Sequence, residues 1–120
     1  MVKFYFTYTA IVEAITGLGL IFVPATVAHI LLGAELAGTL SVVLAMVGGA
    51  AICSIALLSW LSRSGIPARF SLPVLLLYNI AVSLILLYAT LEFGYHGIPI
   101  YGVIIFHLFQ SLLCVVFLKK

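Results

Sequence analysis

Charge is the property that this sequence has least of. Its 120 residues include five Lys or Arg and three Asp or Glu, so that only 7% are charged, while 66% are hydrophobic. A soluble domain carries about 25% charged residues, and disordered chains combine low hydrophobicity with high charge, so both classes are excluded. Five scattered basic residues also form no patch for a nucleic acid, and no nucleic-acid partner is expected.

The sequence motifs of common enzymes are absent as well. The chain has no Gly-x-Ser-x-Gly nucleophile motif and no Gly-rich phosphate loop. Its two cysteines, Cys53 and Cys114, form no Cys-x-x-Cys pair, and neither supports catalysis on its own. We therefore expect neither hydrolytic activity nor a cofactor.

What the sequence does contain is a series of apolar runs long enough to cross a bilayer, which takes about 20 residues. These runs cover residues 4–23, 39–61, 71–91 and 99–118, and Pro67 and Pro73 mark the connector before the third. A lone segment in a bilayer must satisfy its own backbone hydrogen bonds, so each run is expected to be helical. The sequence predicts an all-α integral membrane protein, a four-transmembrane-helix bundle that forms a single polytopic membrane domain over residues 1–120.

The segment 24–38 is the least regular part of the chain. Helix one extended to Leu32 would be about 44 Å long, too long for a hydrocarbon core of about 30 Å. We expect Pro24 to start a short interfacial helix between spans one and two that ends near Gly33. Thr26, His29 and Glu35 would then reach water, and a kinked continuation of helix one is the alternative.

The distribution of basic residues predicts the orientation of the bundle. With four spans, both termini and the connector between spans two and three share one side, which carries all five basic residues: Lys3, Arg63, Arg69, Lys119 and Lys120. Because basic residues in short loops stay in the cytoplasm, we predict that both termini are cytoplasmic. The aromatic residues Phe4, Tyr5, Phe6 and Tyr8 are expected to form an aromatic belt at that side.

Polar residues inside the predicted spans mark the candidate site. A rise of 1.5 Å per residue places Glu13 and Asn79 about 15 Å deep, and Gln110 and His107 about 13 and 18 Å deep, all near the midplane. Carboxylates at that depth usually face the bundle interior and mark function. We predict a binding or proton-coupling site of Glu13, Asn79, His107 and Gln110. The alternative is a structural hydrogen bond from Glu13 to one of the other three.

Small residues recur at every fourth position of the second span: Ser41, Ala45, Gly49 and Cys53. Such faces let helices approach closely, so we predict that this one packs against another helix. Packing within the chain is favoured over packing against a second copy.

Metal and haem sites have weaker support. His29 and His96, with Glu35 and Glu92, lie on the side opposite the termini and could hold a metal ion, and His29 with His107 could ligate a haem. No spacing is diagnostic, and we predict no metal site.

These features predict a small four-span protein that carries out proton- or cation-linked transport of a small solute around Glu13. Four helices are too few to enclose a wide pore, so we expect it to act as an oligomer. Two alternatives stay open: a non-catalytic accessory subunit of a larger membrane complex, and a binding pocket for a lipid, quinone or other apolar ligand. The expected partners are the lipid bilayer and either further copies of the chain or a larger complex.

Overall fold

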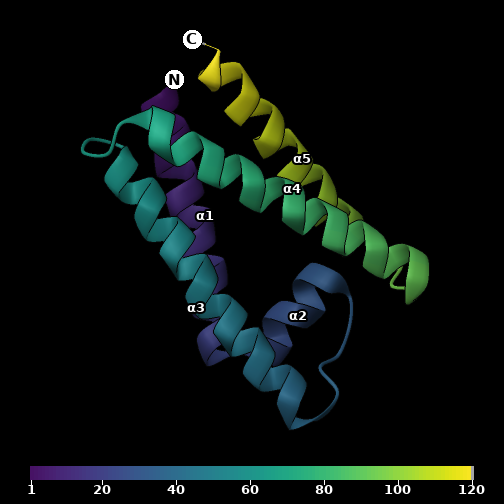
Figure 1. Cartoon of the computed structure of the whole chain (residues 1–120). Coiled ribbons are helices and arrows are strands. Elements are labelled where there is room, and N and C mark those ends of the chain that lie inside the picture. The colour runs from purple at the N-terminus through teal and green to yellow at the C-terminus, as the bar shows by residue number, and fades with distance from the viewer. Residues whose placement is uncertain (120) are drawn as a thin grey trace.

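The computed structural model describes residues 1–119 and is entirely helical over its ordered elements (Figure 1). Its helices are α1 (Val2–Phe22), α2 (Pro24–Leu32), α3 (Gly38–Ser62), α4 (Ala68–Glu92) and α5 (Ile98–Leu118). All but α2 are long and apolar enough to cross a membrane. The predicted fold class, four spans with a short helix after the first, is confirmed, and the protein is a multi-pass integral membrane protein. Lys120 lies outside the described residues.

The break between α1 and α2 has a local cause. Val23 leaves the helical region, with φ −138° and ψ 55°, and Pro24 follows in the first turn of α2, where its missing N–H costs nothing. Gly33 ends α2 in the left-handed region, at φ 65°. The kinked continuation of helix one is therefore wrong, and the short separate helix is confirmed.

The start of the third span differs from the prediction. Helix α4 begins at Ala68, directly after Pro67, and Pro73 lies in its second turn rather than in the connector. Pro73 is the sixth residue of α4, so its missing N–H removes one helical hydrogen bond and its ring affects only the first turn. The helix can therefore start before Pro73.

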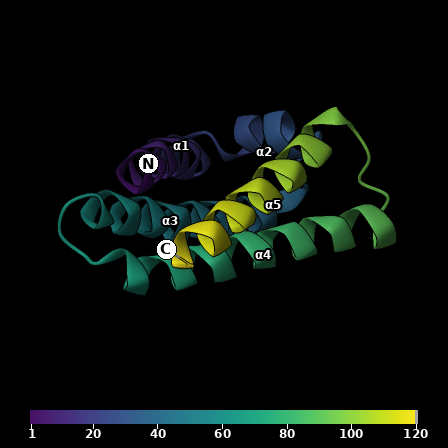
Figure 2. The ribbon, with the colours of Figure 1, turned by 90° about the horizontal axis from the view of Figure 1, so that it is seen from above.

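The four long helices form two pairs that meet like the arms of a V. Helix α1 packs along α3, and α4 packs along α5. The pairs converge where both termini and the α3–α4 connector lie, and they diverge toward α2, which sits between them (Figures 1 and 2). Contacts of α2 with α1, α3 and α5 hold it in this position. The side of the membrane on which the termini lie stays a prediction.

The α1–α3 pair is close because both helices contribute glycine to the contact. A Cβ atom added to Gly17 would lie 2.8 Å from the carbonyl oxygen of Gly49, and one added to Gly49 would lie 2.6 Å from that of Gly17. The two backbones thus touch directly, which a larger residue on either helix would prevent.

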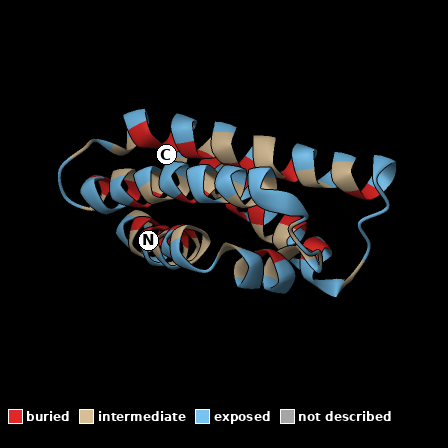
Figure 3. Ribbon diagram, turned by 90° about the horizontal axis from the view of Figure 1, so that it is seen from below, coloured by how far each residue is buried: buried red, intermediate tan, exposed pale blue. Residues whose placement is uncertain are grey.

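Side chains fill the end of the bundle where the pairs converge, which we call the closed end. Its core is Tyr5, Phe6, Leu72, Leu75 and Cys114, all buried. The buried residues lie on the inward faces of the helices (Figure 3). The expected aromatic belt is therefore wrong for Tyr5 and Phe6, because they share the inward face of α1 with Thr9 and Ala10, one turn further on.

Candidate functional site

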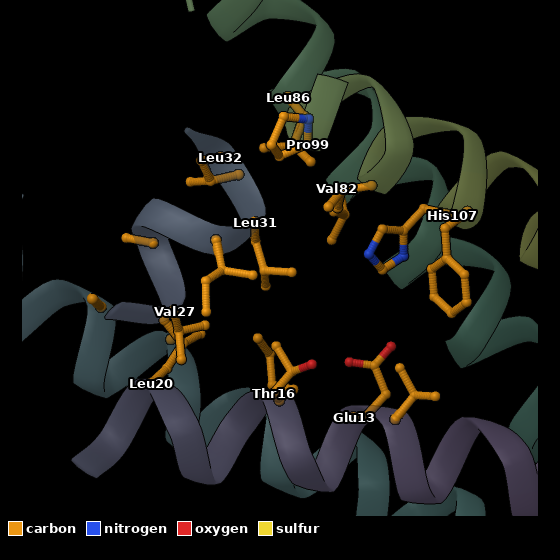
Figure 4. Close-up of a pocket in the computed structure, with 18 of the residues that line it drawn as sticks. Glu13, Thr16, Leu20, Val27, Leu31, Leu32, Val82, Leu86, Pro99 and His107 are labelled. Atoms are coloured by element: carbon orange, nitrogen blue, oxygen red, sulfur yellow. The ribbon is translucent and has the colours of Figure 1, made fainter. Parts of the chain in front are cut away.

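The opposite end of the bundle, which we call the cavity end, contains a cavity of about 780 Å³ that is partly open to the outside. All five helices line it, from the middle of each long helix to the end away from the termini. The walls are apolar except at a few positions (Figure 4). They include Leu20 of α1, Val27 and Leu31 of α2, Ala45 and Gly48 of α3, Val82 and Leu86 of α4, and Pro99 and Val103 of α5.

Glu13 is the acidic residue of this wall. Its side chain is 3% exposed and is directed from α1 into the cavity (Figure 4). The hydroxyl of Tyr78 on α4 donates a hydrogen bond to Oε2 at 3.0 Å. The second carboxyl oxygen, Oε1, receives no hydrogen bond from residues 1–119. The carboxyl group is thus held from one side and is free to bind on the other.

His107 of α5 faces the same cavity from the other arm of the V. Its Nδ1 lies 2.7 Å from Oδ1 of Asn79, and Nδ2 of Asn79 donates to the carbonyl oxygen of Leu75 at 2.7 Å. Asn79 is 1% exposed and lies behind the imidazole rather than on the cavity wall. It therefore supports His107 and joins α4 to α5 within the membrane.

Two aromatic rings fix the plane of the imidazole. The rings of Tyr78 and Phe106 meet it nearly at right angles, with centroids 5.6 and 5.3 Å away. Such edge-to-face contacts are a favoured geometry for aromatic pairs. Since Tyr78 also holds Glu13, one residue of α4 contacts both Glu13 and His107, and Thr16 of α1 adds a hydroxyl group to the same cavity.

Gln110, the fourth predicted site residue, is not part of the cavity wall. It lies one turn closer to the closed end, where its Nε2 donates to Oγ1 of Thr9 at 3.4 Å. Its Oε1 is buried and has no hydrogen-bond partner within residues 1–119. The structure thus brings Glu13, Asn79 and His107 together around Tyr78 and places Gln110 beside them. Their roles stay predictions.

The predicted packing residues of α3 have different surroundings. Gly49 and Cys53 lie against Gly17 of α1, and Ala45 lines the cavity. Ser41 donates to backbone carbonyls of its own first turn. A larger residue at Gly49 would therefore disturb the packing of α3 against α1 within the chain.

The residues considered for metal binding lie apart from one another. His29 is exposed on α2, and Nδ1 of the exposed His96 lies 3.2 Å from the hydroxyl of Tyr101. No group of three or more His, Cys, Asp or Glu that could hold a metal ion is found within residues 1–119.

Sequence reasoning missed Tyr78 and Thr9. The hydrogen bond predicted for Glu13 comes from Tyr78, not from Asn79, Gln110 or His107. One signal could have indicated Tyr78: it directly precedes Asn79, which gives it an estimated depth of about 14 Å, close to that of Glu13. Tyrosine is common at membrane surfaces, and its position alone does not indicate a buried hydroxyl.

Comparisons of the chain with protein families, curated proteins and solved structures find no match. The function must therefore be argued from the chemistry of the cavity.

Proposed function

We propose that the protein binds, within the membrane, an apolar small molecule that carries one polar end. The observation that supports this proposal is that Glu13 and His107 face a mostly apolar cavity of about 780 Å³ from different arms of the V. Ligand cavities typically measure about 300–1,000 Å³ and combine apolar walls with a few polar groups that orient the ligand.

The cost of those polar groups argues for a role. A carboxyl group in the membrane interior is expensive unless it has partners, and such groups usually serve function. Helix packing by itself does not require a carboxyl group in the membrane interior. The closed end of the same bundle packs through apolar residues and through hydroxyl groups that donate to helix carbonyls. A ligand whose polar end meets Glu13 and His107 would satisfy them.

Photolabelling in lipid nanodiscs tests the proposal. The probe is hexadecanol carrying a photoreactive diazirine in mid-chain, and mass spectrometry identifies the labelled residues. Gly48→Leu places a side chain at the cavity wall, where an added Cβ atom meets nothing within 4 Å. We expect it to reduce labelling of cavity walls such as Val82 and Val103 about tenfold, which corresponds to about 1.4 kcal/mol.

The matched control is Ala50→Leu, which adds a side chain of the same size to an exposed position of α3 outside the cavity. It should leave the labelling of the cavity walls unchanged. Equal labelling in the wild type and Gly48→Leu would show that the probe does not enter the cavity, and the proposal would be wrong.

Proton- or cation-linked transport is the second candidate, and the direction of the Glu13 carboxyl into the cavity favours it. Glu13→Gln keeps the hydrogen bonding of the side chain and removes its titration. In proteoliposomes of the wild type, we expect addition of the hexadecanol probe to acidify the lumen, measured with an enclosed pH-sensitive dye. The Glu13→Gln variant should lose this acidification. Glu92→Gln, at the exposed end of α4, is the control. Normal acidification in Glu13→Gln would exclude the coupling role.

A further inference from the structure

The backbone of α4 determines how the Asn79 amide is turned. Its Nδ2 donates to the carbonyl oxygen of Leu75 at 2.7 Å, and that carbonyl can only accept a hydrogen bond. The reversed amide would place two acceptor oxygens against each other, so the network itself assigns the orientation. Oδ1 of Asn79 therefore faces away from its own helix, toward α5.

This orientation determines which nitrogen of His107 carries a hydrogen. Oδ1 of Asn79 can only accept, and it lies 2.7 Å from Nδ1 of His107, so Nδ1 is the donor. The apolar walls favour the neutral ring, because a charge in the membrane interior is costly. In the neutral ring with the hydrogen on Nδ1, Nε2 carries a lone pair and can only accept a hydrogen bond.

That acceptor faces the cavity. Since Nδ1 is engaged by Asn79, the nitrogen directed into the open space in Figure 4 is Nε2. No hydrogen bond reaches it from residues 1–119, and the contacts of Tyr78 and Phe106 keep the ring from turning away. The carboxyl group of Glu13 is directed into the same space. The polar end of a ligand would therefore meet a fixed acceptor next to a carboxyl group.

From this geometry we propose that the ligand is an apolar molecule ending in a hydroxyl group that donates its hydrogen bond to Nε2 of His107. This inference rests on the proposed ligand-binding function and names the class of ligand. A hydroxyl group also accepts, so a protonated Glu13 can donate to the same oxygen. Molecules of the same shape whose polar end only accepts, such as ethers, ketones and quinones, could accept from a protonated Glu13 but would leave Nε2 facing another acceptor, and they would bind more weakly than the alcohol.

A matched pair of probes tests the requirement for a donor. The photoreactive hexadecanol and its O-methyl ether differ by one methyl group, which removes the O–H and leaves an acceptor. Each probe is compared between the full wild-type chain and His107→Phe in nanodiscs, so that differences in partitioning into the lipid cancel. Phenylalanine keeps a ring in that position and removes the acceptor nitrogen.

We expect the wild type to label its cavity walls about tenfold more with the alcohol than with the ether, since a lost buried hydrogen bond leaves a polar atom unsatisfied. His107→Phe should abolish the preference, because it lowers labelling by the alcohol and does not lower labelling by the ether; retained ether labelling also shows that the cavity is intact. Asn79→Leu should reduce the preference too, because it frees the proton position on the ring.

Two results would overturn the inference. Equal labelling of the wild type by both probes, still sensitive to Gly48→Leu, would keep the cavity as a ligand site and exclude the donor requirement. Preference for the hexadecylamine analogue over the alcohol, lost in Glu13→Gln, would assign the ligand to the cations. Labelling of the walls by none of the three probes would instead count against the proposed function itself.

Discussion

The closed end of the bundle is filled by Tyr5, Phe6, Leu72, Leu75 and Cys114, whereas the same helices border a partly open cavity of about 780 Å³ at the cavity end. The difference comes from α2, which lies between the two helix pairs where they diverge (Figure 1). The short helix α2 thus contacts both helix pairs at this end, but it does not fill the space between them.

Polar groups behave differently at the two ends. At the closed end, Ser62 bonds to the carbonyl oxygen of Leu58 and to Ser71, so these two hydroxyl groups find partners within the protein, whereas the buried hydroxyl of Ser59 has none within residues 1–119. At the cavity end, Oε1 of Glu13 and Nε2 of His107 have no protein partner within residues 1–119. The hydrogen bond between Ser62 and Ser71 joins α3 to α4, whereas the unpaired atoms of Glu13 and His107 are available to a ligand in the cavity.

The largest expected effect comes from the same substitution at both ends of α4. Leu75→Ala removes a fully buried side chain of the closed end and should cost about 3 kcal/mol, because a new void forms among packed neighbours. Leu86→Ala at the cavity wall should cost about 1 kcal/mol or less, because its side chain already borders empty space. Unfolding of both variants in one detergent measures the difference. Equal losses would show that the cavity end is as well packed as the closed end.

A second, smaller effect concerns neighbouring glycines of α3. Gly49→Ala should cost about 2 kcal/mol, because its Cβ would lie 2.6 Å from the carbonyl oxygen of Gly17 and the backbones must separate. Gly48→Ala points into the cavity, meets nothing within 4 Å and should be neutral or slightly stabilising. Thermal unfolding of the two variants gives the comparison. A stable Gly49→Ala would contradict the direct backbone contact.

The smallest effect separates the two ends by function rather than by stability. Tyr78→Phe and Tyr5→Phe each remove one hydroxyl group that forms a hydrogen bond between helices, with Glu13 and with Cys114 respectively. Each should lower stability by about 0.6 kcal/mol, the average for hydrogen bonds between membrane helices. Only Tyr78→Phe should also weaken photolabelling of the cavity, by about threefold, because the Glu13 carboxyl loses its restraint. Equal effects of both variants on labelling would remove Tyr78 from the site.

Part of the site could be predicted because single residues stood out from their surroundings. Glu13 is the one acidic residue inside an apolar run, and a depth estimate from the helical rise placed Asn79 and His107 at a similar level. Gln110 shows the limit of that estimate. It lies one turn from His107, and this small step takes it out of the cavity and onto Thr9. Tyr78 could not be predicted, because nothing local distinguishes a buried tyrosine from one at the membrane surface.

The number, type and approximate bounds of the helices follow from the sequence by itself, because hydropathy, Pro24 and Gly33 act on the chain locally. The buried polar residues of α1, α4 and α5 indicated roughly which face of each helix is turned inward. Only the tertiary structure decided the exact rotation and pairing, because most of each helix surface is apolar and its neighbours depend on packing. The pairing of Glu13 with Tyr78, the tautomer of His107 and the cavity between the arms all depend on that rotation. For this reason they became visible only once the helices were assembled.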